Sequence, residues 1–105
     1  MREIKFRGKR VDNGEWEFGY LESLREIRGY FIDPETVGQF TGLKDKNGKE
    51  IYEGDIIKSP RFINYPISYI NGEFVANINI VVYTKDIWNL GQVIGNCVDN
   101  PELLK

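Results

Sequence analysis

Apolar and polar residues alternate along several short stretches of this chain, in the manner of half-buried β-strands. Between Ala76 and Val82 every second residue is apolar, which is the period of a strand with one face on a core. Asn-Gly pairs begin at Asn13, Asn47 and Asn71, and this dipeptide is the strongest local signal for a hairpin turn. The pattern predicts an all-β chain of three hairpins, folded into small barrel-like or SH3-like β layers.

The register of the first hairpin decides what its two faces carry. A two-residue loop at Asn13-Gly14 sets Lys9 opposite Phe18 and gives a basic–aromatic face suited to stacking bases. A three-residue loop ending at Gly14 sets Lys9 opposite Glu17 and separates apolar from charged side chains. A slip of one residue exchanges the two outcomes. We favour the three-residue loop, in which glycine takes the left-handed position of a bulge.

The same logic applies to the second hairpin, at Asn47-Gly48. A two-residue turn would place Lys46 opposite Lys49, and like charges in direct opposition destabilise a strand pair. A three-residue loop from Lys46 to Gly48 sets Asp45 against Lys49 instead. We therefore predict a bulged turn here too.

The third hairpin and the rest of the chain complete the assignment. Two prolines argue for an irregular loop over residues 59–66. Asp-Pro-Glu and Asn-Pro-Glu each place a capping residue before a proline, which begins a helical turn. The predicted elements are a short strand Pro66–Ile70, a long strand Glu73–Tyr83, a last strand Trp88–Gly95, and helical turns over Pro34–Gln39 and from Pro101 to Leu104.

A chain of 105 residues suits one domain. We predict a single domain over residues 1–105, with a subdivision near residues 50–58 as the alternative. A chain this short buries only roughly 60–68% of its unfolded surface and has modest stability, so we expect it to associate with copies of itself. The apolar residues expected at that interface are Tyr83, Trp88, Leu103 and Leu104.

The amino-acid composition excludes several kinds of catalysis and metal binding. The chain has no histidine, which excludes histidine-based nucleophilic catalysis and histidine metal sites. Its one cysteine, Cys97, allows no internal disulfide and suits a reducing cytoplasm. The basic start has no apolar run behind it, unlike a signal peptide, and no apolar stretch reaches membrane-spanning length. We expect a non-enzymatic protein of the bacterial cytoplasm, without cofactor, metal or membrane contact.

Positive charge gathers at the start of the chain, although the net charge is only −2. Five cations face one carboxylate in the first ten residues, and they are the candidate nucleic-acid contacts. The competing interpretation is a solvated strand face paired with glutamates, which a slightly acidic chain favours. The cations are Arg2, Lys5, Arg7, Lys9 and Arg10.

The aromatic side chains have two possible roles, a platform on which bases stack or the core of the domain. Alternating aromatics in a small β domain usually face inward, so we expect a core. If Trp16, Phe18 and Tyr20 are buried with Phe6, the stacking platform disappears and with it the main support for nucleic-acid binding. The aromatic group consists of Trp16, Phe18, Tyr20, Tyr30, Phe31 and Phe40.

Four carboxylates cluster in the centre of the chain, at Asp45, Glu50, Glu53 and Asp55. Such a group can bind a metal or exchange protons. Turn chemistry explains each acid without a site, by lysine pairs for Asp45 and Glu50 and by a corner hydrogen bond for Asp55. We therefore predict no catalytic or metal residues here.

Several motifs span nearly the whole chain, and the central block is the most specific of them. They are Phe6–Lys9, Gly14–Trp16, Gly19-Tyr20, Thr36–Gln39, Thr41–Asp55, Val93–Asn96 and Asp99–Leu103. Together these motifs resemble the YopX family, whose members are small proteins of phages and prophages. The resemblance implies a mainly β fold, a phage or prophage origin and homo-oligomerisation, and it implies no activity.

From these observations we expect a self-associating β binding module that acts on a host or phage protein. The alternative is a nucleic-acid-binding accessory protein that uses the basic N-terminal strand.

Overall fold

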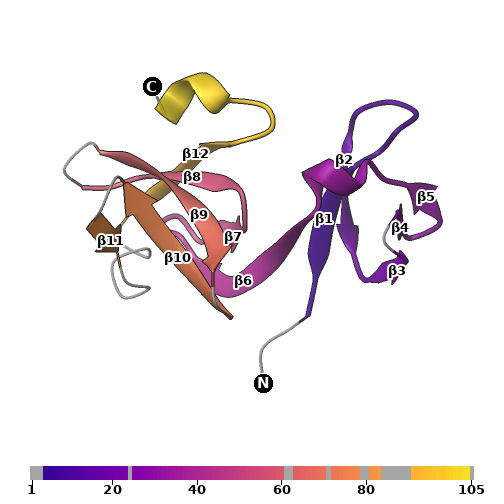
Figure 1. The fold of residues 1–105 in the computed structure, drawn as a ribbon, viewed down its shortest axis with the longest axis horizontal. Coiled ribbons are helices and arrows are strands. Elements are labelled where there is room, and N and C mark those ends of the chain that lie inside the picture. The colour runs from indigo at the N-terminus through magenta and orange to yellow at the C-terminus, as the bar shows by residue number, and fades with distance from the viewer. Residues whose placement is uncertain are drawn as a thin grey trace. The chain divides into compact units, whose positions relative to one another are not determined.

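The protein is an all-β molecule in the computed structural model (Figure 1). Within the residues that the structure describes, regular structure consists of strands β1 to β12 and two short 3-10 turns, η1 and η3. The chain divides into two compact units, residues 1–40 and 41–105. The structure describes residues 4–23, 25–60, 63–70, 72–78, 81–83 and 91–104.

The first unit combines a hairpin with a small three-stranded sheet. Strands β1 and β2 pair antiparallel, and β3, β4 and β5 form an antiparallel sheet in that order. A β-bridge between Arg10 and Ile32 joins the end of β1 to the segment after β5. The elements are β1 (Phe6–Lys9), β2 (Trp16–Gly19), β3 (Leu21–Ser23), β4 (Glu26–Ile27), β5 (Tyr30–Phe31) and η1 (Pro34–Thr36).

The first hairpin forms where expected, but its predicted three-residue register is wrong by one residue. Lys9 pairs with Trp16, not with Glu17. The Arg10 N–H donates to the Glu15 carbonyl at 2.8 Å, so the loop holds the four residues 11–14. The slip exchanges the two faces, and the basic residues of β1 share a face with the aromatic residues of β2.

The interior of the first unit is aliphatic, and the predicted aromatic core is wrong for most of its members. Ile27 and Ile32 are fully buried. Gly8 lies so close to Ile32 that an added Cβ would contact its side chain directly. Phe40 is buried and Trp16 is half-buried. The exposed aromatics are Phe18, Tyr20, Tyr30 and Phe31.

The second unit holds a five-stranded sheet in the order β11-β10-β9-β8-β12. Strand β6 begins in the first unit, where Gln39 pairs with Phe6 of β1, and then pairs with β7. The core is built from Ile51, Ile57, Tyr65, Ile67, Phe74, Ala76 and Val93. The elements are β6 (Gly38–Lys44), β7 (Glu50–Tyr52), β8 (Asp55–Lys58), β9 (Asn64–Ile70), β10 (Glu73–Ile78), β11 (Val81–Tyr83), β12 (Gln92–Asn96) and η3 (Pro101–Leu104).

Both Asn-Gly sites of this unit lie between paired strands, as predicted. The Asp45 N–H donates to the Lys49 carbonyl at 2.8 Å, which closes the expected three-residue loop, and Gly48 has φ +82°. Ile70 of β9 pairs with Glu73 of β10. The second and third hairpins are therefore confirmed.

Two other predictions for this unit need correction. The expected long strand Glu73–Tyr83 is two antiparallel strands, in which Ile78 pairs with Val81. The expected loop up to Pro66 is shorter, because Pro66 already pairs with Ile56 inside β9. The last strand is β12, and the part of the prediction around Trp88 lies outside the described residues.

The two helical turns form as single 3-10 turns. Asp33 caps η1, because its Oδ1 accepts the Glu35 N–H at 3.0 Å. The turn ends at Thr36, three residues before the predicted end. No helix among the described residues is long and apolar enough to cross a membrane.

Candidate binding surface

Two exposed aromatic side chains of the first unit come from a tight hairpin. Ile27 of β4 pairs with Tyr30 of β5, so Arg28 and Gly29 form the loop. Their φ values are +54° and +83°, as in a type I′ turn, whose twist matches that of the strands. The turn leads directly into Tyr30 and Phe31, which are both exposed.

Phe31 lies opposite Val11, and the two form one apolar pair on the surface. The Val11 N–H donates to the Phe31 carbonyl at 2.9 Å, next to the bridge between Arg10 and Ile32. Each of the two side chains is 68% exposed. With Asp12, Gly29 and Tyr30 they line a pocket of about 280 Å³. We call these five residues the Phe31 surface.

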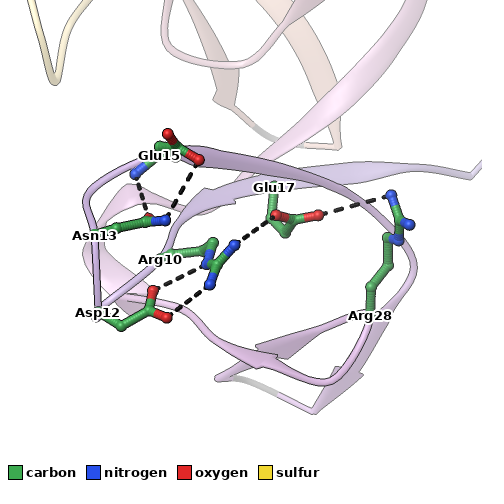
Figure 2. Close-up of polar contacts among 6 residues, drawn as sticks. All are labelled: Arg10, Asp12, Asn13, Glu15, Glu17 and Arg28. Atoms are coloured by element: carbon green, nitrogen blue, oxygen red, sulfur yellow. Dashed lines mark hydrogen bonds and ion pairs between the residues drawn. The ribbon is translucent and has the colours of Figure 1, made fainter.

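The Arg10 guanidinium stabilises this surface from beside it. Its Nε and Nη2 atoms donate to the two Asp12 carboxylate oxygens at 2.9 and 2.7 Å (Figure 2). Its central carbon lies 3.8 Å from the centre of the Tyr30 ring, which is cation–π distance. The hydrogen bond with Asp12 raises the pKa of Arg10 and lowers the pKa of Asp12. The Arg10 side chain thereby holds both the loop and the Tyr30 ring.

Further polar contacts stabilise the four-residue loop (Figure 2). The Asn13 side-chain oxygen accepts the Glu15 N–H at 2.9 Å, and its amide nitrogen donates to the Glu15 carboxylate at 3.3 Å. Glu17 lies between two guanidinium groups, at 3.8 Å from Arg10 and 3.7 Å from Arg28. These contacts link the loop, β2 and the β4–β5 turn.

The predicted nucleic-acid contacts are distributed among several environments. Arg2 lies outside the described residues. The Lys5 ammonium lies 5.1 Å from the centre of the Phe40 ring. Arg7 is buried. Lys9 and Arg7 both lie over the Trp16 ring, at 5.6 and 4.7 Å, and Arg10 belongs to the Asp12 network described above.

The exposed charge of the first unit is acidic. In its described part, residues 4–23 and 25–40, the exposed cations are Arg25 and Arg28. Glu17 and Glu26 are half-buried there, as are Lys5, Lys9 and Arg10. The exposed carboxylates are those of Asp12, Glu15, Glu22, Asp33 and Glu35.

The predicted oligomer contacts are only partly visible. Trp88 lies outside the described residues, and Tyr83 belongs to β11. Leu104 is exposed. Leu103 serves its own unit, because its carbonyl accepts the Asn64 amide at 3.0 Å and its side chain lies beside Gly95.

The central carboxylates stabilise turns. Asp55 is buried and its Oδ2 accepts the Tyr52 N–H at 2.7 Å, which confirms the corner hydrogen bond. Asp45 is buried too, and it accepts three backbone N–H groups, from Asn47, Lys49 and Val93, at 2.8 to 2.9 Å. Burial raises the pKa of Asp45, but these hydrogen bonds lower it by more. The pKa of Asp45 therefore lies below its ordinary value. In the described ranges no three acidic or cysteine side chains are placed to hold a metal ion.

Three members of the Phe31 surface were missed by the sequence analysis. Val11, Asp12 and Gly29 were not considered there as site residues. A usable signal exists, because Arg28-Gly29 separates the apolar Ile27 from Tyr30, and glycine between two strand-forming residues marks a turn. The two-residue loop and the surface that it presents could have been proposed from this.

Together these features define a small all-β protein of two units, with an acidic and aromatic surface on the first. The family described as YopX protein matches residues 2–105, and the chain belongs to that family. Among solved structures it is similar to protein EF1440 from Enterococcus faecalis, at 30% identity and a TM-score of 0.57. The match covers 98% of this chain and 76% of that chain. A search of curated proteins gave no match.

Proposed function

We propose that this chain is a non-enzymatic, self-associating protein-binding module of phage or prophage origin, which works in the bacterial cytoplasm. Its partner is a host or phage protein, and the Phe31 surface is the contact. The observation that carries the proposal is the exposed pair Val11 and Phe31, each 68% exposed, beside a Tyr30 ring stacked by Arg10. Aromatic residues and arginine are enriched at protein interfaces and among their energetic hot spots.

The arrangement also favours binding because it is pre-organised. The Arg10–Asp12 pair, the Asn13 contacts and the two-residue turn hold the loop and the Tyr30 ring before any partner arrives. A surface held in its bound conformation loses less entropy on association.

The test measures the affinity of this chain for each partner in purified form. Full-length protein captures partners from a bacterial host lysate, and each captured protein is identified, purified and titrated by calorimetry. We expect Phe31→Ser to weaken binding at least about tenfold, as for a hot-spot aromatic, and Val98→Ser, an exposed residue of the second unit, to leave it unchanged. Equal affinities of wild type and Phe31→Ser for every purified partner would refute the proposal.

Self-association is measured separately. Leu104 and Ile63 are exposed in the second unit, and such apolar residues are available for contact between copies. Light scattering on the purified chain should give a defined mass above that of the 12.2 kDa monomer. A monomer at all accessible concentrations would remove self-association from the proposal.

Nucleic-acid binding is the second candidate, and one observation favours it. Arg7 and Lys9 of β1 lie on the same face as Trp16 and Phe18 of β2, which is the basic–aromatic combination used for single strands. The acidic exposed charge of the unit opposes it. Titration with labelled single- and double-stranded DNA at low and physiological salt decides: a steep loss of affinity with salt supports this candidate, and no binding rejects it.

A further inference from the structure

The strand register places charged and apolar residues in adjacent rows around the Phe31 surface. Phe31 pairs with Glu26 on one side and lies opposite Val11 on the other. The Asp33 N–H donates to the Lys9 carbonyl at 2.9 Å, so these two residues form the next row. Because side chains alternate along a strand, Phe31 and Asp33 project to the same side.

Carboxylates therefore flank the apolar pair. Asp12 follows Val11 directly and keeps 63% of its side chain exposed, although it pairs with Arg10. Asp33 is exposed two residues after Phe31, and Glu35 is exposed two residues further on. Of the neighbouring cations, Arg10 pairs with Asp12 and lies over Tyr30, and the Lys9 ammonium lies near Trp16. Arg28 of the β4–β5 turn is exposed and lies 3.7 Å from Glu17.

We infer that the Phe31 surface takes a basic–apolar peptide segment, in which an aromatic or aliphatic side chain contacts Val11 and Phe31 while lysine or arginine on either side faces the carboxylates. This inference rests on the proposed function and names its partner's chemistry. Complementary charge across an interface mainly sets specificity and association rate. The same carboxylates repel phosphates, so a nucleic acid is the occupant that this surface disfavours.

The test begins with random peptides displayed against the purified full-length chain. The most enriched peptide is then synthesised, and its affinity is measured by fluorescence anisotropy at low and at physiological salt. Three variants are compared with wild type. Phe31→Ser removes the apolar contact. Asp33→Asn removes one charge and keeps the cap of η1, because asparagine caps helical turns as well as aspartate. Val98→Ser is the control in the second unit.

We expect the enriched peptides to carry lysine or arginine within two residues of an aromatic or aliphatic residue. Phe31→Ser should weaken their binding about tenfold or more. Asp33→Asn should weaken it about two- to threefold at low salt and less at physiological salt, because screening removes the difference. Val98→Ser should have no effect.

Other outcomes distinguish a failure of the basic–apolar inference from a failure of the protein-binding proposal. Neutral or acidic peptides that depend on Phe31 would overturn the basic–apolar inference and leave the protein-binding proposal standing. Peptides indifferent to Phe31→Ser would overturn both. Displacement of the bound peptide by single-stranded DNA, in competition at physiological salt, would assign the surface to nucleic acid and would also overturn the inference.

Discussion

Replacement of Asp45 tests how one buried carboxylate holds the second unit together. Its Oδ1 accepts the N–H groups of Asn47 and Lys49, at 2.8 and 2.9 Å. Its Oδ2 accepts the N–H of Val93, at 2.9 Å and 48 residues away in sequence. The side chain thus fixes the β6–β7 turn and connects it to β12.

The two oxygens make the expected loss of stability calculable. Asp45→Asn can keep its carbonyl oxygen toward Asn47 and Lys49, but its NH₂ group then faces the Val93 N–H, and two donors cannot bond. One hydrogen bond to a charged group is lost and one buried donor is unsatisfied, which together cost about 3 kcal/mol. Asp45→Ala loses all three bonds and should cost about 4 kcal/mol or more. Lys46→Ala, at an exposed residue of the same loop, should change stability by less than about 0.5 kcal/mol.

Acid should reduce the difference between wild type and Asp45→Asn. The folded pKa of Asp45 lies below its ordinary value, whereas the unfolded carboxyl titrates near about 3.9. The contribution of the carboxylate is therefore complete above about pH 4 and is lost as the pH falls through the folded pKa. Asparagine does not titrate, so its stability lacks this dependence.

Urea unfolding at pH 7 and at pH 2.5, with the Val93 amide followed by hydrogen exchange, measures both effects. We expect a large loss of stability at pH 7, a smaller one in acid, and faster exchange of the Val93 amide in the variant. A loss below about 1 kcal/mol at pH 7 would show that the Asp45 carboxylate does not stabilise the turn, because one hydrogen bond to a charged group should contribute more. A difference that is constant between the two pH values would show the same.

Three glycines give further predictions. Gly8→Ala forces a Cβ against Ile32 and should lower the stability of the first unit by about 1–3 kcal/mol, as overpacking does; an unchanged thermal melt would contradict this. Gly48→Val places a β-branched residue at φ +82° and should cost at least about 1–2 kcal/mol, whereas Gly48→Asn should be tolerated better because asparagine enters this region more readily; equal urea midpoints would argue against the bulged turn. Gly95→Ala brings a Cβ within 2.9 Å of the Asn100 and Leu103 side chains and should release η3, detected as faster carboxypeptidase digestion; digestion at the wild-type rate would show that η3 stays docked.

The hairpins could be predicted from sequence because their signal is local. Asn-Gly at 13, 47 and 71 marks a conformation that few other residue pairs adopt, and all three sites lie between paired strands. The loop from Lys46 to Gly48 was also predictable, because only one register avoids opposing lysines there. Local backbone preference and charge repulsion were sufficient for these features.

The register of the first hairpin was not predictable from the same reasoning. Its loop has four residues because side chains decide its length: Asp12 bonds Arg10, and Asn13 bonds Glu15. Segregation of apolar from charged residues, the criterion used for the prediction, assumes that the aromatics belong to the core. Four of the six do not, since Ile27 and Ile32 fill the interior and Gly8 leaves no room for a larger neighbour.

The candidate site could be predicted only in part. Arg10 was identified from the charge of the first strand, but its partners Asp12 and Tyr30 depend on the loop and on a bridge to Ile32. A long-range bridge of this kind leaves no local pattern in the sequence. The exposed position of Phe31 depends on the same bridge. Ile32 of the bridge is buried, and Phe31, the preceding residue, projects to the opposite side of the strand.

A chemical-shift map of the ¹⁵N-labelled chain with the most enriched basic–apolar peptide tests the role of the Phe31 surface. We expect the largest changes on the amides of Val11, Gly29 and Phe31, at the loop and the β4–β5 turn. Changes confined to residues 41–105, or centred on Trp16 and Phe18 with the Phe31 surface undisturbed, would contradict this prediction.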